Sequence, residues 1–193
     1  MQERLQAVTI GELVPLAGPI HMVDPDPEWP KLFSREAERI QASLGDRVLL
    51  LEHVGSTSVP GLAAKPIIDI VLVVTDSADE PAYAPALEAA GYLLRIREPD
   101  WYEHRVFKRS DPAINLHVFS PSCSEVDRML LFRNWLRSNA SDRRLYEDTK
   151  RKLAGQRWEY TQNYADAKTT VVEEILARAR EGAREQTCED DSL

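Results

Sequence analysis

Two successive predicted strands, the second of them apolar except for one carboxylate, constrain the fold of this chain more than any other feature. Residues 47–54 are rich in Val and Leu and predict a strand that ends at Gly55-Ser56. After a loop of small residues, residues 66–74 predict a second strand, apolar on both faces and interrupted by Asp69. Such a strand is typical of a sheet covered by helices on both sides. We therefore expect a central sheet with helices packed against it.

The rest of the chain predicts more strands and then a run of helices. Alternating and helical patterns before residue 120 indicate helices over 29–44 and 82–90, and strands over 92–97, 103–109 and 114–119. From residue 124 onward the pattern is helical, over 125–138, 142–153 and 159–182. The predicted fold class is α+β, a mixed β-sheet flanked by helices with a C-terminal helical bundle.

The chain is long enough for one domain with an extension at each end. Its 193 residues can bury an ordinary core without disulfides or metals. Prolines break the N-terminal arm, in which residues 19–23 could add an edge strand. The expected parts are an arm over 1–27, one domain over 28–182 (sheet core about 28–120, helical part about 121–182) and an acidic, disordered tail over 183–193.

Composition argues against several classes of function. The chain has 24 basic and 32 acidic residues, which disfavours a broad surface for DNA or RNA but allows a local basic pocket. No apolar run is long enough to span a bilayer, and the first twenty residues lack a signal-peptide pattern. Two cysteines, Cys123 and Cys188, make no disulfide framework. We expect a cytoplasmic protein with no membrane partner.

Asp69 and the Gly-Ser loop before it are the first candidates for a functional site. A carboxylate within an apolar strand is costly unless it is paired or bound to a cation. Gly55 allows close approach of the backbone to a ligand, and Ser56 and Thr57 can donate hydrogen bonds to phosphate oxygens. We expect Asp69 to bind a metal or a substrate; the alternative is an aspartate that accepts backbone amides at a bend.

Three more side chains lie on the same predicted strands or on the strand 114–119. Glu52 and His53 alternate, so only one of them can face Asp69. His53 is expected to be a hydrogen-bonded structural residue. His117 alternates with apolar neighbours, and as a neutral imidazole it could bind a metal or act as a general base, with a structural role as the alternative.

Basic residues provide candidates for phosphate binding. Lys168 lies on the apolar stripe of its predicted helix, so it reaches a phosphate beside Asp69, or else it extends outward to solvent or pairs with an acid. Lys65 precedes the second strand and could also reach a phosphate, with simple exposure to solvent as the alternative. Arg105 could hold a phosphate as a fork, or belong to an ordinary surface strand. Charged residues between 143 and 152, Lys150 among them, are expected to form a solvated helix face.

The sequence resembles the GrpB family, which is placed in the nucleotidyltransferase-fold superfamily. The resemblance rests on residues 53–62 (HVGSTSVPGL) followed by 65–70 (KPIIDI). Further matching segments are VDPDPEWP at 23–30, LHVF at 116–119 and YADAK at 164–168. Some members resemble domains fused to dephospho-CoA kinase, which implies nucleotide or cofactor chemistry.

The superfamily resemblance implies two-metal phosphoryl transfer, in which a Gly-Ser loop holds a triphosphate and carboxylates hold Mg²⁺ or Mn²⁺. Gly55, Ser56 and Asp69 fit that pattern. The second carboxylate position is Val71, and Asn115 and His117 occupy the strand where a third acid is expected. This departure leaves a site with one metal held by substitute ligands, Glu52 or His117, or a site that has lost the transfer chemistry.

Two functions follow as expectations. The first is an enzyme that binds a nucleoside triphosphate or other phosphorylated small molecule with Mg²⁺ or Mn²⁺ and transfers a nucleotidyl or phosphoryl group to a small acceptor. Asp69 and His117 would be catalytic, Asp69, Glu52 and His117 would bind the metal, and the phosphates would lie against Gly55, Ser56, Thr57, Lys65, Arg105 and Lys168. The alternative is a catalytically inactive ligand-binding or interaction module, which Val71 favours.

Overall fold

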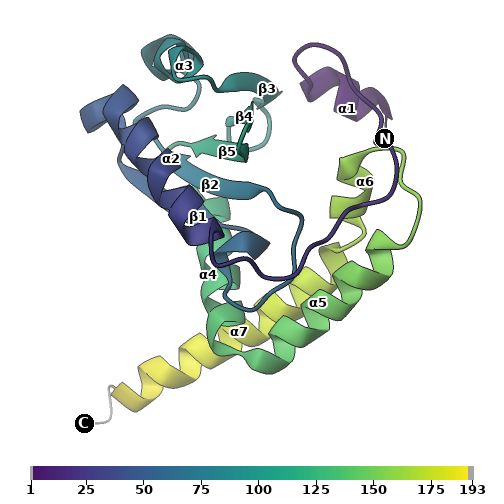
Figure 1. The fold of residues 1–193 in the computed structure, drawn as a ribbon. Coiled ribbons are helices and arrows are strands. Elements are labelled where there is room, and N and C mark those ends of the chain that lie inside the picture. The colour runs from purple at the N-terminus through teal and green to yellow at the C-terminus, as the bar shows by residue number, and fades with distance from the viewer. Residues whose placement is uncertain (1, 191–193) are drawn as a thin grey trace.

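The fold is α+β, as expected, with a five-stranded mixed sheet (Figure 1). The structure, a computed structural model, describes residues 2–190, with side chains through residue 184. The strands are β1 Leu50–Val54, β2 Ile68–Val73, β3 Leu93–Glu98, β4 His104–Ser110 and β5 Ala113–Phe119. The helices are α1 Gln2–Val8, α2 Trp29–Leu44, α3 Glu80–Ala89, α4 Ser124–Ser138, α5 Ala140–Ala154, α6 Thr161–Asp166 and α7 Thr169–Asp190.

The strand order β1-β2-β5-β4-β3 places β2 inside the sheet, as its apolar sequence predicts. β1 and β2 are antiparallel, with Val54 opposite Asp69, whereas β2 and β5 are parallel, with Asp69 opposite Asn115. β4 and β3 continue the sheet with antiparallel pairing. A short 3₁₀ turn over Gly45–Arg47 delays the start of β1 relative to the predicted strand. Asp69, Asn115 and Lys108 therefore form one row of neighbours across three strands.

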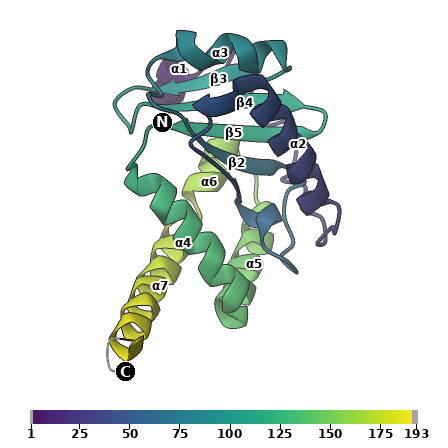
Figure 2. The same cartoon turned by 90° about the vertical axis from the view of Figure 1, so that its left-hand side faces the viewer.

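Helices cover the two faces of the sheet differently. α2 and α3 pack on one face, where the alternate β2 residues Ile68, Ile70 and Leu72 are buried with side chains of both helices. α4 to α7 lie on the other side (Figures 1 and 2). There only the end of the sheet around Val71 and Phe119 packs tightly against α4. None of the described helices is long and apolar enough to cross a membrane.

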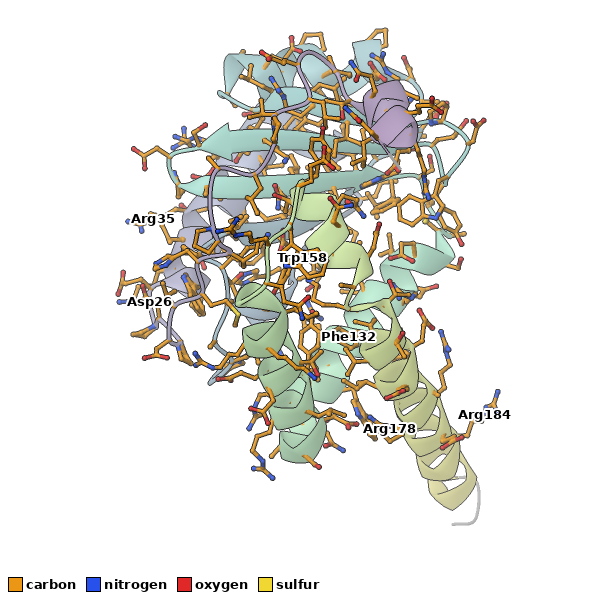
Figure 3. All side chains as sticks on the ribbon, turned by 90° about the vertical axis from the view of Figure 1, so that its right-hand side faces the viewer. Asp26, Arg35, Phe132, Trp158, Arg178 and Arg184 are labelled. Carbon is orange, nitrogen blue, oxygen red and sulfur yellow. The ribbon has the colours of Figure 1, made fainter. Side chains whose placement is uncertain are left out.

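The C-terminal helices form the predicted bundle, with one difference. Figure 3 shows Phe132 of α4 between α5 and α7, where it packs edge-on against Tyr146. The ion pair between Arg178 and Asp142 joins α7 to α5. The prediction of a single helix over 159–182 is wrong, because a tight turn separates α6 from α7. The turn places Lys168 directly before α7, where its carbonyl accepts the first hydrogen bond of that helix.

The two ends of the chain also differ from the expected extensions. The arm contains α1, and the segment expected as an edge strand forms only an isolated bridge between Val23 and Ala64. A second bridge joins Thr9 to Ile96 on β3. At the other end the backbone of α7 continues through Asp190, across most of the expected tail. The rest of that tail, residues 191–193, lies outside the described residues.

Candidate functional site

A cavity of about 880 Å³ lies between the sheet, the C-terminal helices and the N-terminal arm. Its walls come from segments that are far apart in sequence. They include the loop after β1, the ends of β2 and β5, the strands β3 and β4, helices α4 to α7 and residues 4–14 of the arm. A volume of this size suits a small molecule. The cavity is therefore the candidate functional site.

Asp69 lies at the start of β2 and faces this cavity. Its side chain is 29% exposed, and its Oδ1 accepts a hydrogen bond from Asn115 Nδ2 at 2.8 Å. His117 Nε2 lies 3.9 Å from the same oxygen, close enough for charge but too long for a hydrogen bond. Burial raises the pKa of Asp69, but His117, Asn115 and Lys65 together outweigh it and lower the pKa. Asp69 is thus held as a carboxylate.

Gly55 is required by the position of this carboxylate. Its φ is +69°, in the left-handed region, and a Cβ added there would lie 3.0 Å from the Asp69 Cβ and collide with its carboxylate. The close approach predicted for Gly55 is therefore present, although the group that approaches is Asp69. The loop and the carboxylate fit together only when residue 55 has no side chain.

Ser56 and Thr57 have different roles. Ser56 faces the cavity, where its Oγ accepts a hydrogen bond from Lys150 Nζ at 3.0 Å. The Thr57 hydroxyl donates to the Ile67 carbonyl and lies 3.0 Å from His53 Nε2. His53 is buried on the opposite face of the sheet, and burial lowers its pKa to about 4, so it is a neutral structural residue. The Thr57 hydroxyl is used within the fold and is not presented to a phosphate.

Three lysines from three separate segments converge on the cavity, and we call Lys65, Lys150 and Lys168 the lysine cluster. Lys65 Nζ and Lys168 Nζ lie 5.5 and 4.5 Å from the centre of the Tyr164 ring. Lys150 Nζ donates to the carbonyl of Ala63 as well as to Ser56. Within residues 2–184 none of the three lysines forms an ion pair with a carboxylate. Each nevertheless has a lowered pKa, caused first by burial.

Lys150 is the site residue that sequence reasoning missed. The expectation of a solvated face is wrong for it, because the residue is 3% exposed and its pKa is lowered to about 7. Asp142, Tyr146 and Lys150 follow one another at intervals of four on α5, and all three are buried. The aromatic Tyr146 in an otherwise charged helix was the available signal, because it marks the face that turns inward.

A chain of two histidines leads into the cavity beside Asp69. The carboxylate of Glu98 lies 2.9 Å from His104 Nδ1, and His104 Nε2 lies 3.0 Å from His117 Nδ1. Burial, acting against the hydrogen bond to Glu98, lowers the pKa of His104, which is therefore neutral. A neutral His104 donates its one proton to Glu98 and must accept from His117 Nδ1–H. In neutral His117, Nε2 then carries the lone pair and faces Asp69.

Two of the expected site residues lie elsewhere. Glu52 is on the same face as Asp69, but its carboxylate pairs with Arg133 at 2.6 Å, and it is absent from the cavity wall. Arg105 is on the opposite face, where it is 4% exposed and pairs with Glu80. Neither residue is available for the expected role, because each already has a buried or half-buried partner of opposite charge.

The residues present do not fit a two-metal centre. Val71, at the second carboxylate position, is fully buried among Val54, Val73, Phe119 and Val126. Asn115, at the place of a third acid, turns its amide N–H toward Asp69. Across the described part of the chain, no three His, Cys, Asp or Glu side chains are grouped to hold a metal. The expected set of Asp69, Glu52 and His117 is not assembled.

The fold and the cavity define an α+β protein in which Asp69 and the lysine cluster line one cavity, and comparison with known proteins gives the family. The GrpB protein family model matches residues 19–178, and the chain belongs to the GrpB family. A crystal structure of GrpB from Enterococcus faecalis has the same fold, with a TM-score of 0.75 and 28% identity over 84% of this chain and 99% of that one.

Two relatives in sequence differ in how much of their own length the match covers. A UPF0157 protein of Halalkalibacterium halodurans is 64% identical and covers 92% of this chain and 91% of its own length. A dephospho-CoA kinase of Mycolicibacterium paratuberculosis is 31% identical and covers 77% of this chain and 46% of its own. The first relative matches nearly end to end, whereas in the kinase the match takes up less than half of the protein.

Proposed function

We propose that the protein binds a nucleotide or another phosphorylated small molecule in this cavity, with the phosphates against the lysine cluster. The observation that carries the proposal is the convergence of Lys65, Lys150 and Lys168 on a cavity that Ser56 and Asp69 also line. Ammonium groups removed from water without counter-ions are unfavourable. A phosphate anion would supply the missing charge and would restore the lowered pKa values of the lysines.

The lysines take the place that metal ions hold in a two-metal site. Asp69 and His117 are two possible ligands for a divalent cation, and Val71 supplies none. In this proposal the protein's positive charge therefore comes from ammonium groups, and any Mg²⁺ or Mn²⁺ would be tested as an addition to the ligand. The proposal does not depend on the metal.

A second candidate function, transfer of a phosphoryl or nucleotidyl group, is favoured by the histidine chain. His117 Nε2 faces the cavity next to Asp69, and in the neutral form of His117 it is placed where a general base for an acceptor hydroxyl would be needed. Glu98 and His104 would act as positioning residues, because they fix which nitrogen of His117 carries the proton. Without these histidines, the cavity residues would favour binding alone.

Binding is tested by calorimetry with tripolyphosphate, ATP and dephospho-CoA, each with and without Mg²⁺ or Mn²⁺. Lys150→Met keeps the length of the side chain and removes the ammonium group. We expect it to weaken all three ligands at least tenfold, because a charge-assisted hydrogen bond contributes about 1.5–3 kcal/mol. Lys152→Met is the matched control, since Lys152 is exposed on the same helix. Equal affinities for the two variants, or no binding by the wild type, would refute the proposal.

A further inference from the structure

The cavity continues well beyond the lysine cluster. From Asp69 on β2 it extends across β5 and β4 to the edge strand β3, where the apolar residues Leu93, Ile96 and the nearby Trp101 line it together with the charged Arg95 and Glu98. About 880 Å³ is far more than a chain of phosphates requires, since it approaches the upper end of the range for drug-sized ligands. The part of the cavity near β3 must therefore receive some other portion of the ligand.

This second part of the cavity has unusual exposed apolar side chains. Val14, Leu93 and Trp101 are 66%, 60% and 37% exposed, and all three line the cavity. They are half of the large apolar residues that are exposed in the described chain, the others being Leu49, Tyr102 and Leu145. Exposed apolar side chains along the wall of a cavity are typical of a binding site.

The N-terminal arm forms one wall of this apolar part. Ile10 donates its amide N–H to the Arg95 carbonyl on β3 at 2.8 Å, and Leu16 donates to the Glu159 carbonyl before α6 at 2.8 Å. The chain between these two anchors passes from the sheet edge to α6, and Figure 1 shows α1 and α6 on the same side of the molecule. Leu5, Val8 and Leu13 line the cavity from the arm.

We infer that the arm and β3 bind the apolar, nucleoside-like portion of the phosphorylated ligand and so select which phosphorylated molecule is bound. The inference rests on the proposed function, because the phosphates are assumed to occupy the lysine cluster. It assigns a specificity role to residues 4–14, which lie before the part of the chain that the family model matches. Phosphate contacts then supply affinity common to many ligands, and the arm supplies the difference between them.

The two parts are separated by comparing a ligand that has only phosphates with one that also carries a nucleoside. Affinities for tripolyphosphate and ATP are measured for the wild type, Val14→Asp and Leu93→Ser. Both side chains are more than half exposed, so neither substitution is expected to disturb folding. We expect each variant to bind ATP about tenfold more weakly and tripolyphosphate as tightly as the wild type does, because only ATP has a portion that buries these side chains.

Leu49→Ser is the matched control, an exposed apolar residue outside the cavity, and should change neither affinity. If the cavity variants change neither ligand, or change both ligands equally, the inference is wrong while the proposed function stands. If Lys150→Met leaves tripolyphosphate binding unchanged, the proposed function itself fails. The two failures are therefore distinguished by which ligand and which variant respond.

Discussion

The two faces of β2 differ in their surroundings, although alternate residues of the same six-residue strand form them. Ile68, Ile70 and Leu72 face α2 and α3, and each is no more than 1% exposed. On the other face, Asp69 opens into the cavity, whereas Val71, two residues further, is packed against α4. The first face is a uniform core, and the second is divided into a polar half and an apolar half.

This difference shows which position of β2 can hold a charged side chain. Asp69 is supported by Gly55, which leaves room for its carboxylate, and by Asn115, which donates to it. Val71 has neither kind of support, and its neighbours on the same face are apolar. The boundary between the two halves falls between Asp69 and Val71, the position where the resemblance implied a second carboxylate. Val71 belongs to the apolar core instead.

The largest change in stability should come from replacing Val71 by aspartate. We expect Val71→Asp to lower the free energy of unfolding by about 3–5 kcal/mol, because it buries an unpaired charge two residues from Asp69. Denaturant unfolding measures the change, and Val71→Thr is a neutral control of similar size that should lose less. A loss below 1 kcal/mol, or tight Mn²⁺ binding by the folded variant, would show that the second face is not divided as described.

A smaller effect is expected in the pH dependence of stability. Burial lowers the pKa of Lys150 to about 7 from 10.5, so above pH 7 the unfolded state binds more protons than the folded state. The wild type should therefore become more stable relative to Lys150→Met as the pH rises from 7 toward 10, by at most about 1.4 kcal/mol per pH unit. Lys152→Met should follow the wild type. Parallel curves for wild type and Lys150→Met would mean that Lys150 is solvated.

The smallest effect on stability should come from the histidine chain. Glu98→Leu removes the acceptor of His104 and is expected to change the free energy of unfolding by less than about 1 kcal/mol. In ¹⁵N spectra of the wild type, neutral His117 should carry its proton on Nδ1, whereas the variant should show a mixture of both tautomers. The exposed His21 serves as the internal control in each spectrum. A mixture already present in the wild type would remove the argument for transfer chemistry.

Most of the fold could be predicted from sequence, because apolar periodicity records which residues are buried. All five strands and the four helices α2 to α5 lie where the pattern indicates them, within a few residues, whereas α6 and α7 replace a single predicted helix. The turn before Lys168 escaped detection, since no proline or glycine marks it. The end of the short helix α1 also lacks a sequence signal, because the prolines of the arm begin several residues after it. Periodicity shows that a segment is helical more reliably than it shows where the helix is interrupted.

The site was less predictable, because its members are decided by partners that are distant in sequence. Asp69, Ser56, Lys65 and Lys168 all line the cavity, but Lys168 does so from the turn between α6 and α7 and not from the helical stripe that was expected. Glu52 and Arg105 have the right chemistry but are engaged by Arg133 and Glu80. Sequence spacing does not reveal such ion pairs, and it did not indicate that Lys150 is buried. Which charged groups are left without a partner is known only once the tertiary contacts are formed.

The position of the arm on β3 also has a consequence for self-association. β3 is the last strand of the sheet, and the free backbone groups of such a strand can pair with another molecule. The bridge at Thr9 and the hydrogen bond from Ile10 occupy part of this edge. A segment that lines a ligand cavity therefore also shields the sheet from its neighbours in solution. Changes that loosen the arm would uncover this part of the β3 edge and make the protein prone to aggregation.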